Sequence, residues 1–161
     1  MSVSEDEFKR CMGAWPSGVT IVTTRSGERI HGMTVSDFSG ASLSPALVAV
    51  CCNRESTTTR LIEEGKCFAV NILAADQQDL SNRFASRNYE SSRFEGIDFE
   101  QAVTGAPLLP GAVANIDCRL AFTHDAGDHV IFLGEVQSIR LVEKEPLVFC
   151  RGSYRQLGQT L

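Results

Sequence analysis

Long apolar runs and a secretion signal are missing from this sequence of 161 residues. No stretch approaches the ~20 consecutive apolar residues that a membrane-spanning helix needs. The first residues, MSVSEDEFKRCMGAW, are charged and contain no apolar signal-peptide segment. The sequence therefore predicts a cytoplasmic protein without a membrane partner, folded as a single domain over residues 1–161.

Clusters of basic residues are also missing. The chain carries 15 Lys and Arg against 20 Asp and Glu, for a net charge of −5. Proteins that bind nucleic acid usually present basic patches that neutralise phosphates. We therefore expect no nucleic-acid partner, although local groups could still hold a small anionic ligand.

The six cysteines show no metal-binding pattern, because none forms a C-x-x-C pair and no Cys/His group has zinc-like spacing. Cys51, Cys67, Cys118 and Cys150 each lie inside an apolar, strand-like run. This context is typical of reduced, buried cysteines that pack as small hydrophobic residues. The sequence predicts no metal site.

The common catalytic motifs are absent as well. The chain has no G-x-G-x-x-G, no G-x-S-x-G and no H-E-x-x-H, and its elements show no βαβ alternation. These absences argue against a Rossmann fold, a P-loop and the usual hydrolase sites. We predict no side chain that acts as nucleophile or as general acid or base.

Strand patterns dominate what is present. β-branched or apolar runs predict strands at residues 19–24, 29–35, 47–52, 67–73, 112–122, 129–142 and 146–152. Short helices are predicted over residues 5–15, from Ser56 or Thr57 to Gly65, and from an Asp76 cap to Ala85. This pattern indicates a mainly β protein, a mostly antiparallel closed sheet or β-barrel with a few short helices.

Three regions carry more specific expectations. Residues 36–45 are rich in Ser and Gly and predict a loop, and residues 86–111 predict a long irregular segment. Residues 112–122 alternate, so that Ala114, Cys118 and Phe122 should face the core while Asn115 and Asp117 face solvent. A turn is expected over residues 123–128.

Hydroxyl side chains gather where predicted strands meet loops, at Thr34, Ser36, Ser39, Ser42 and Ser44, and again at Ser56, Thr57, Thr58 and Thr59. Such a pattern is common in solvated turns and helix caps. With Arg54, Arg60 or Arg83 nearby, the same groups would also suit a phosphorylated cofactor. Both interpretations remain open from the residues alone.

His129 follows the turn Asp125-Ala126-Gly127-Asp128 and begins a predicted strand. It could be a simple turn-ending residue or a group directed at a ligand.

An ordered set of segments resembles the short-chain flavin reductase family, which supplies reduced flavin in two-component flavin-dependent monooxygenases. The segments are WPSGVTIVTT, HGMTVSDFSGASLSPALVAVCCNRESTT, FAVNILAADQQDLSNRFAS, GDHVIFLGEV and PLVFCRGSYRQL. The resemblance implies a flavin-binding split β-barrel, usually a homodimer, that uses NAD(P)H to reduce FMN or FAD. It also implies a partner monooxygenase that receives the reduced flavin.

The resemblance implies roles for individual positions. Flavin contacts fall on Met33, Thr34, Val35, Ser36, Ser42, Cys51, Cys52, Asn53, Ser56, Thr57, Thr58, Arg83 and Phe84. His129, in the G-D-H segment, and Tyr154 would lie beside the nicotinamide. The chain departs from the family pattern at Asp37, where the family often has Ser or Asn, and at Ser44-Pro45-Ala46, where the family often has Asp-Pro-Pro.

Two functions from different classes follow from this resemblance. The first is an NAD(P)H:flavin oxidoreductase that transfers a hydride from nicotinamide to flavin, with the cofactors holding the reactivity and the protein orienting them. The second is a non-catalytic, flavoredoxin-like flavin or electron carrier on the same barrel. A β-barrel binding module without flavin is a more distant third.

Overall fold

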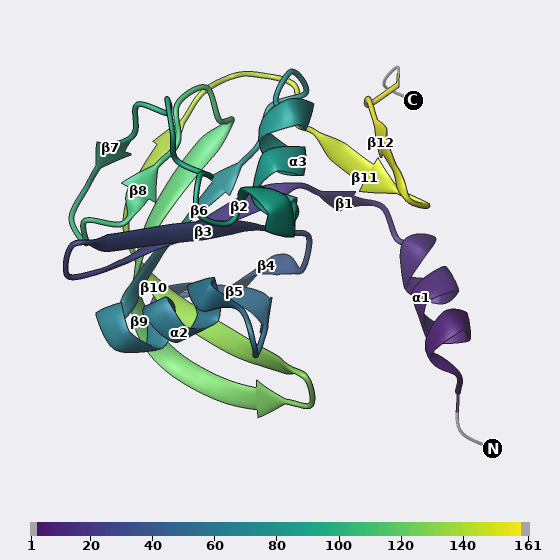
Figure 1. Ribbon diagram of the computed structural model, residues 1–161, viewed down its shortest axis with the longest axis horizontal. Helices are drawn as coiled ribbons and strands as arrows, with labels where there is room; N and C mark the ends of the chain where they lie inside the picture. The colour runs from purple at the N-terminus through teal and green to yellow at the C-terminus, as the bar shows by residue number, and fades with distance from the viewer. Residues whose placement is uncertain (1–2, 159–161) are drawn as a thin grey trace.

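A computed structural model describes residues 3–158 (Figure 1). The helical elements are α1 (Glu5–Gly13), α2 (Thr57–Gly65), α3 (Gln78–Ala85) and the 3-10 helix η1 (Arg87–Tyr89). The strands are β1 (Ser17–Gly18), β2 (Thr20–Ser26), β3 (Arg29–Val35), β4 (Phe38–Leu43), β5 (Ala46–Asn53), β6 (Cys67–Ile72), β7 (Glu100–Gln101), β8 (Pro107–Leu108), β9 (Ala114–Ala126), β10 (His129–Leu141), β11 (Val148–Cys150) and β12 (Ser153–Arg155). No helix within residues 3–158 is long and apolar enough to cross a bilayer.

Seven strands form one antiparallel sheet in the order β3-β2-β6-β9-β10-β5-β4. The sheet curls around its own core, with α3 above β2 and β3 and α2 below these two strands in the view of Figure 1. Among the described residues, the edge strands β3 and β4 share no ladder, so the barrel is split between them. The expected mainly β, mostly antiparallel barrel is confirmed.

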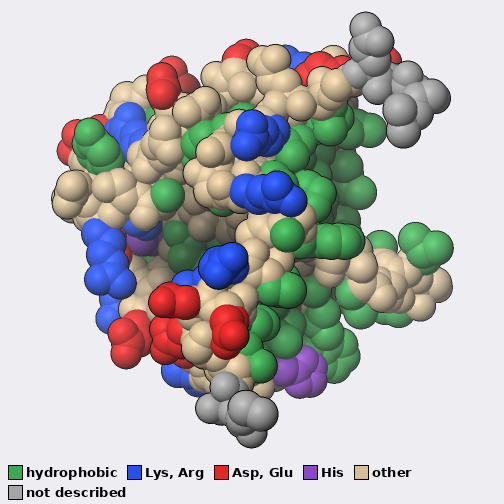
Figure 2. Space-filling model, turned by 90° about the vertical axis from the view of Figure 1, so that its right-hand side faces the viewer, with side chains coloured by type: hydrophobic (Ala, Val, Ile, Leu, Met, Phe, Trp, Pro, Cys, Tyr) green, Lys and Arg blue, Asp and Glu red, His purple; other side chains and the backbone are tan. Residues whose placement is uncertain are grey.

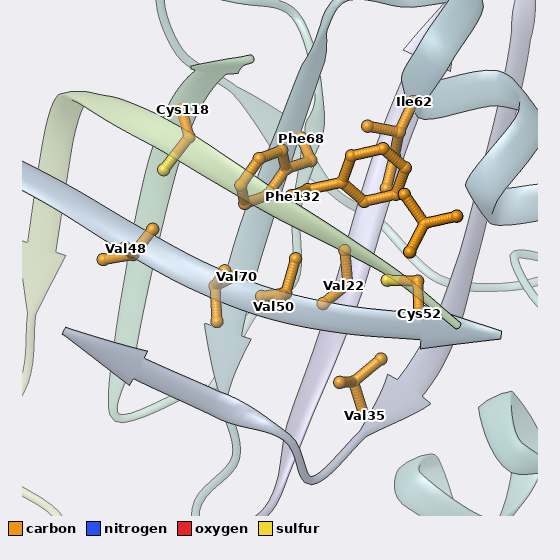
Figure 3. Packing of buried hydrophobic residues seen from close by; sticks show 11 residues of the cluster. Val22, Val35, Val48, Val50, Cys52, Ile62, Phe68, Val70, Cys118 and Phe132 are labelled. Atoms are coloured by element: carbon orange, nitrogen blue, oxygen red, sulfur yellow. The ribbon is translucent and has the colours of Figure 1, made fainter. Parts of the chain in front are cut away.

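The core inside the barrel is built from β-branched and aromatic side chains that point inward at every second strand position. Val22, Val50, Val70, Phe68 and Phe132 are fully buried and converge there (Figure 3). Burial of each such side chain contributes about 1.5–3 kcal/mol. Ile62 of α2 closes the same cluster, which fixes α2 against the barrel.

A second cluster holds α3 and the irregular segment 86–99 against the sheet. Phe84 of α3 packs with Leu73 and Leu109, and its ring meets Phe94 edge-to-face at a centroid distance of 5.2 Å. Phe94 in turn contacts Phe99 at 5.6 Å. The segment expected to be irregular is therefore anchored by aromatic contacts, and residues 86–111 also contain η1, β7 and β8.

The prediction that Asn115 and Asp117, in residues 112–122, face solvent is wrong. Asn115 and Asp117 are buried, because residues 104–109 cover that face of β9. Asn115 donates to the Leu109 carbonyl at 3.0 Å, and Asp117 accepts from the Thr104 amide at 2.9 Å. Conversely, Phe122 is exposed, because β9 runs beyond the core at that point.

Several element boundaries also differ from expectation. Residues 38–43, expected as loop, form β4 and pair with β5. The predicted Asp76 cap is wrong, since α3 begins at Gln78 and its N-cap Gln77 makes no side-chain cap bond. The predicted Ser56 cap is confirmed, because its side chain accepts from the Thr59 amide. β9 continues to Ala126, so the turn narrows to Gly127 and Asp128.

Candidate functional site

Two cavities are lined by residues at or next to the ends of β3 and β5. The first, here the large cavity, has a volume of about 730 Å³. Ser36 and Asp37 line it from the β3–β4 connection, Phe38 from the start of β4, and Cys51 from β5. Apolar groups complete it, namely Met12, Trp15, Pro16, Ile72 and Phe149. The large cavity therefore offers flat apolar walls with a polar edge.

The second, here the polar cavity, has a volume of about 430 Å³. It is lined by His31, Met33, Thr34, Asn53, Glu55, Ser56, Phe84, Ala85, Arg87, Glu90 and Arg93. The ends of β3 and β5 contribute to both cavities, because Thr34 and Asn53 face the polar cavity while Ser36 and Cys51 face the large one. A long ligand that crosses these strand ends could therefore occupy both.

The structure brings most of the predicted flavin contacts to these cavities. Met33, Thr34, Asn53, Ser56 and Phe84 line the polar cavity, and Ser36 and Cys51 line the large cavity. Thr34 is already engaged, since its hydroxyl donates to the Ser81 carbonyl at 2.7 Å. This bond ties the end of β3 to α3 and fixes the wall between the two cavities.

Other predicted contacts lie elsewhere. The side chains of Val35 and Cys52 pack in the barrel core, so that only their main chain can meet a ligand. Arg83 donates to the carbonyls of Ser92 and Glu95 (2.6 Å for Glu95), which tethers segment 86–99 rather than placing its guanidinium at either cavity. Ser42 pairs with Leu47 beside a bulge in β4 and lines neither cavity.

The hydroxyl side chains at the start of α2 make different hydrogen bonds. Ser56 caps the helix, and Thr58 is fully buried with its hydroxyl 2.8 Å from Nδ1 of His31. Thr57 points outward and donates to Oε1 of Glu90 at 2.8 Å. Of this run, Ser56 lines the polar cavity, whereas Thr57 and Thr58 line neither cavity.

His129 pairs across the β5–β10 ladder with Asn53, which places the histidine next to a residue of the polar cavity. Its Nδ1 lies 2.8 Å from Oδ1 of Asp128, and this hydrogen bond lowers the pKa of the Asp128 carboxyl. The Tyr154 hydroxyl donates to Oδ1 of Asn82 at 2.9 Å and can accept from the Ser81 hydroxyl at 2.9 Å, while its ring packs on Phe149 of the large cavity at 5.3 Å. Tyr154 therefore supports the cavity wall.

The cysteines of β5 and β9 are held as thiols. Burial raises the pKa of Cys52 and that of Cys118 to about 12. Burial, and secondarily the nearby Asp37 carboxylate, also raises the pKa of Cys51. Asp37 thus places its charge at the edge of the large cavity without activating this thiol.

Sequence reasoning missed the charged floor of the polar cavity. His31 received no functional assignment, and Glu90 and Arg93 lay in the segment expected to be irregular. No motif marks them, since only the folding of residues 86–99 over β3 brings them together. That Trp15 and Phe149 line the same cavity was likewise not predicted, because Phe149 is brought to the N-terminal segment only by the β1–β11 pairing, in which it lies opposite Ser17.

The two cavities fit a flavin nucleotide in size and chemistry. Small-molecule sites commonly measure about 300–1,000 Å³ and combine apolar walls with a few polar groups. The large cavity supplies apolar walls for a flat ring, and the polar cavity supplies hydroxyl and basic groups for a phosphate. Arg93 is buried there with an Nε that has no hydrogen-bond partner, which is a polar group suited to an anionic ligand.

Comparisons with known proteins agree with this geometry. Residues 12–158 match the family model described as "Flavin reductase like domain". The chain is 38% identical over 154 residues to a flavin-dependent monooxygenase reductase subunit, HsaB, of Rhodococcus jostii, covering 95% of this chain and 78% of that protein. It is 40% identical over 152 residues to an FMN reductase (NADH), SmoA, of Agrobacterium fabrum, covering 94% and 86%.

The fold comparison gives the same answer. The NADH:FAD oxidoreductase SgcE6 of Streptomyces globisporus superposes with a TM-score of 0.91 at 32% identity, covering 99% of this chain and 98% of that chain. The family resemblance carried by the five sequence segments is thereby confirmed. With the matched model spanning nearly the whole chain, this protein belongs to the flavin reductase family.

Proposed function

We propose that this protein is an NAD(P)H-dependent flavin reductase that transfers a hydride from nicotinamide to FMN or FAD. It releases the reduced flavin to a partner monooxygenase. The proposal includes a cytoplasmic location and assembly as a homodimer. Named relatives use NADH with FMN or with FAD, which supports either flavin as the acceptor.

The observation that carries this proposal is the pair of cavities joined by the ends of β3 and β5. One has apolar walls that can stack against a flat ring, and the other has hydroxyl and basic groups. The nicotinamide and the flavin supply the redox chemistry when both are bound. The protein's task is to hold two rings in contact and to exclude water, which requires shape and orientation rather than a nucleophile.

Individual residues suit these tasks. Trp15 and Phe149 offer aromatic surface in the large cavity, and Ser36 offers a hydroxyl at its edge. His129 stands beside Asn53, where it can orient the nicotinamide nucleotide. Its bond to Asp128 fixes one ring nitrogen and leaves Nε2 free for that contact.

A turnover assay at substoichiometric protein tests the proposal. Purified protein is mixed with NADH and a large excess of FMN, and the loss of NADH absorbance is followed. A reductase consumes many equivalents of NADH per chain. A flavoredoxin-like carrier would hold flavin in its visible spectrum yet consume at most one equivalent, and this outcome would contradict the proposal.

Assembly as a homodimer is supported by α1. Its capping box, formed by Ser4 and Glu7, makes it a well-defined helix, yet none of its residues is buried. Phe8 and Trp15 are 61% and 72% exposed. Figure 2, viewed from the side of α1, shows hydrophobic side chains gathered along this face. A second copy that covers this face would also close the large cavity, which Met12 and Trp15 line.

A further inference from the structure

Among the residues that line the large cavity, Asp37 is the one that carries a charge. The other lining residues are apolar or have uncharged polar groups. The basic side chains nearby, Arg87 and Arg93, line the polar cavity instead. The described part of the chain thus gives the large cavity a carboxylate and no cation.

The backbone of Asp37 is fixed by a hydrogen bond to β5. Asp37 lies in the connection between β3 and β4, and its carbonyl accepts from the amide of Cys51 at 3.0 Å. Cys51 lines the same cavity, and its burial, followed by the charge of Asp37, raises the pKa of its thiol. Within residues 3–158 the Asp37 carboxylate takes part in no ion pair. Its negative charge therefore acts at the cavity wall without a neutralising cation.

Flavin reduction changes the charge of a ring held in this cavity. One proton and two electrons pass as a hydride from C4 of the nicotinamide to N5 of the flavin. NADH thereby becomes NAD⁺, and the isoalloxazine ring, neutral when oxidised, becomes an anion at neutral pH. A carboxylate beside the ring repels the anion and has little effect on the neutral ring.

We propose that Asp37 makes the large cavity bind oxidised flavin in preference to reduced flavin, and that it thereby favours release of the reduced product. This inference rests on the proposed function and deepens it, because it assigns a residue to the exchange of product for substrate. A partner monooxygenase can use the reduced flavin only after its release. Asp37 is exposed, so water and salt screen its charge and the expected effect is modest.

Removal of this charge should change the relative affinity for the two redox states. Asp37→Asn keeps the shape of the side chain and should lower the dissociation constant of reduced FMN, relative to that of oxidised FMN, about two- to five-fold. The flavin phosphate is present in both states, so its own repulsion by Asp37 cancels in this ratio. Riboflavin, which lacks the phosphate, should therefore show the same change.

The experiment measures the midpoint potential of flavin bound to an excess of the full-length protein, in anaerobic solution against a reference dye. A tenfold change in the ratio of dissociation constants is about 30 mV for a two-electron couple, so Asp37→Asn should raise the potential of bound FMN by about 9–21 mV. The difference should shrink in high salt, and also near pH ~5, where carboxylates stay ionised but the reduced ring takes up a proton. Asp98→Asn is the matched control, because Asp98 lines neither cavity.

Two results would overturn the inference. One is a midpoint potential that neither Asp37→Asn nor a second variant, Asp37→Ser, raises above that of the unaltered protein. The other is an equal rise in Asp98→Asn. Either result, in a protein that reduces flavin with NADH, removes the role of Asp37 and leaves the proposed function standing. If the unaltered protein neither binds flavin nor oxidises NADH, the proposed function fails and this inference falls with it.

Discussion

His129 is the residue whose role is most sharply testable, because it stands at the start of β10 opposite Asn53. If it orients the nicotinamide nucleotide, His129→Ala should raise KM for NADH by roughly ten- to a hundred-fold, the cost of a hydrogen bond to a charged group. The dissociation constant for FMN should barely change. Steady-state kinetics with each substrate varied in turn measures both.

The exposed His124 on β9 offers a matched control, and His124→Ala should leave both constants unchanged. A fall in kcat with KM for NADH unchanged would instead assign His129 to the chemical step. Kinetics that stay within about two-fold would reduce it to a turn residue.

The absence of a side chain at Gly65 lets the end of α2 approach β2 closely. A Cβ added there would lie 1.8 Å from the carbonyl oxygen of Arg25 in β2, whereas one added at Gly13 meets nothing within 4 Å. Both glycines are the last residues of their helices. Gly65→Ala should therefore lower the free energy of unfolding by about 1–3 kcal/mol or more, because α2 must shift away from the sheet.

The matched variant Gly13→Ala should be neutral or slightly stabilising, since Ala favours helix over Gly. Urea unfolding of both variants decides the matter. Equal stabilities would show that α2 can move without cost, contrary to the tight approach seen here.

The cysteines should differ sharply in reactivity. Cys52 and Cys118 are buried and their pKa values are raised to about 12, so almost no thiolate exists at pH 8. Cys11 on α1 is exposed. Iodoacetamide at pH 8 should alkylate Cys11 in the native protein, and Cys52 and Cys118 only after denaturation. Mass spectrometry that finds Cys52 labelled as fast as Cys11 would contradict the buried core described here.

At the scale of elements, most strands could be predicted from the periodicity of apolar residues. The β-branched runs of β2, β5 and β6 could be assigned because alternation or continuous apolarity is a local signal. β4 was missed, since FSGASL is polar and becomes a strand only by pairing with β5. The buried polar side of β9 was missed for a related reason, because Asn115 and Asp117 are covered by a distant segment.

The candidate site divides in the same way. Thr34, Ser36 and Asn53 were predictable, because they lie at strand ends within segments that resemble the family. His31, Glu90 and Arg93 were not, since their meeting depends on how residues 86–99 fold over β3. The sequence alone could not tell which of the adjacent residues Cys51 and Cys52 faces the core. The alternation of β5 puts Cys52 in the core and Cys51 in the large cavity.

The exposed apolar residues at and next to helix α1 allow the proposed homodimer to be tested. Phe8 and Met12 on α1, and Trp15 just beyond its C-terminal end, are exposed large hydrophobic residues, and α1 buries none of its own side chains. Replacing Phe8 and Trp15 by Ser should weaken a homodimer, because about 25 cal/mol is lost per Å² of apolar contact. Light scattering at micromolar protein should report a dimer for the unaltered chain and a larger monomer fraction for the variant.

A stable monomer of the unaltered chain that still reduces flavin would contradict the proposed dimer. Replacement of Glu5 and Asp6, on the same helix, by Gln and Asn provides a control that alters α1 without removing its apolar residues.

For the whole molecule, the split barrel explains how a chain with no catalytic triad can serve a redox reaction. The gap between β3 and β4 leaves strand ends whose side chains face two cavities of different character. The barrel core fixes those strand ends, and the clusters around α3 fix the wall between the cavities. Rigid placement of two cofactors is what this architecture offers to catalysis.

Anaerobic mixing of NADH with FMN, with and without a catalytic amount of protein, tests this account most directly. The flavin absorbance is followed until it is constant, and NADH consumption is measured in the same sample. The account predicts rapid bleaching of the oxidised flavin, with one NADH consumed per flavin reduced and a rate proportional to protein concentration. Bleaching no faster than in the protein-free sample would contradict it.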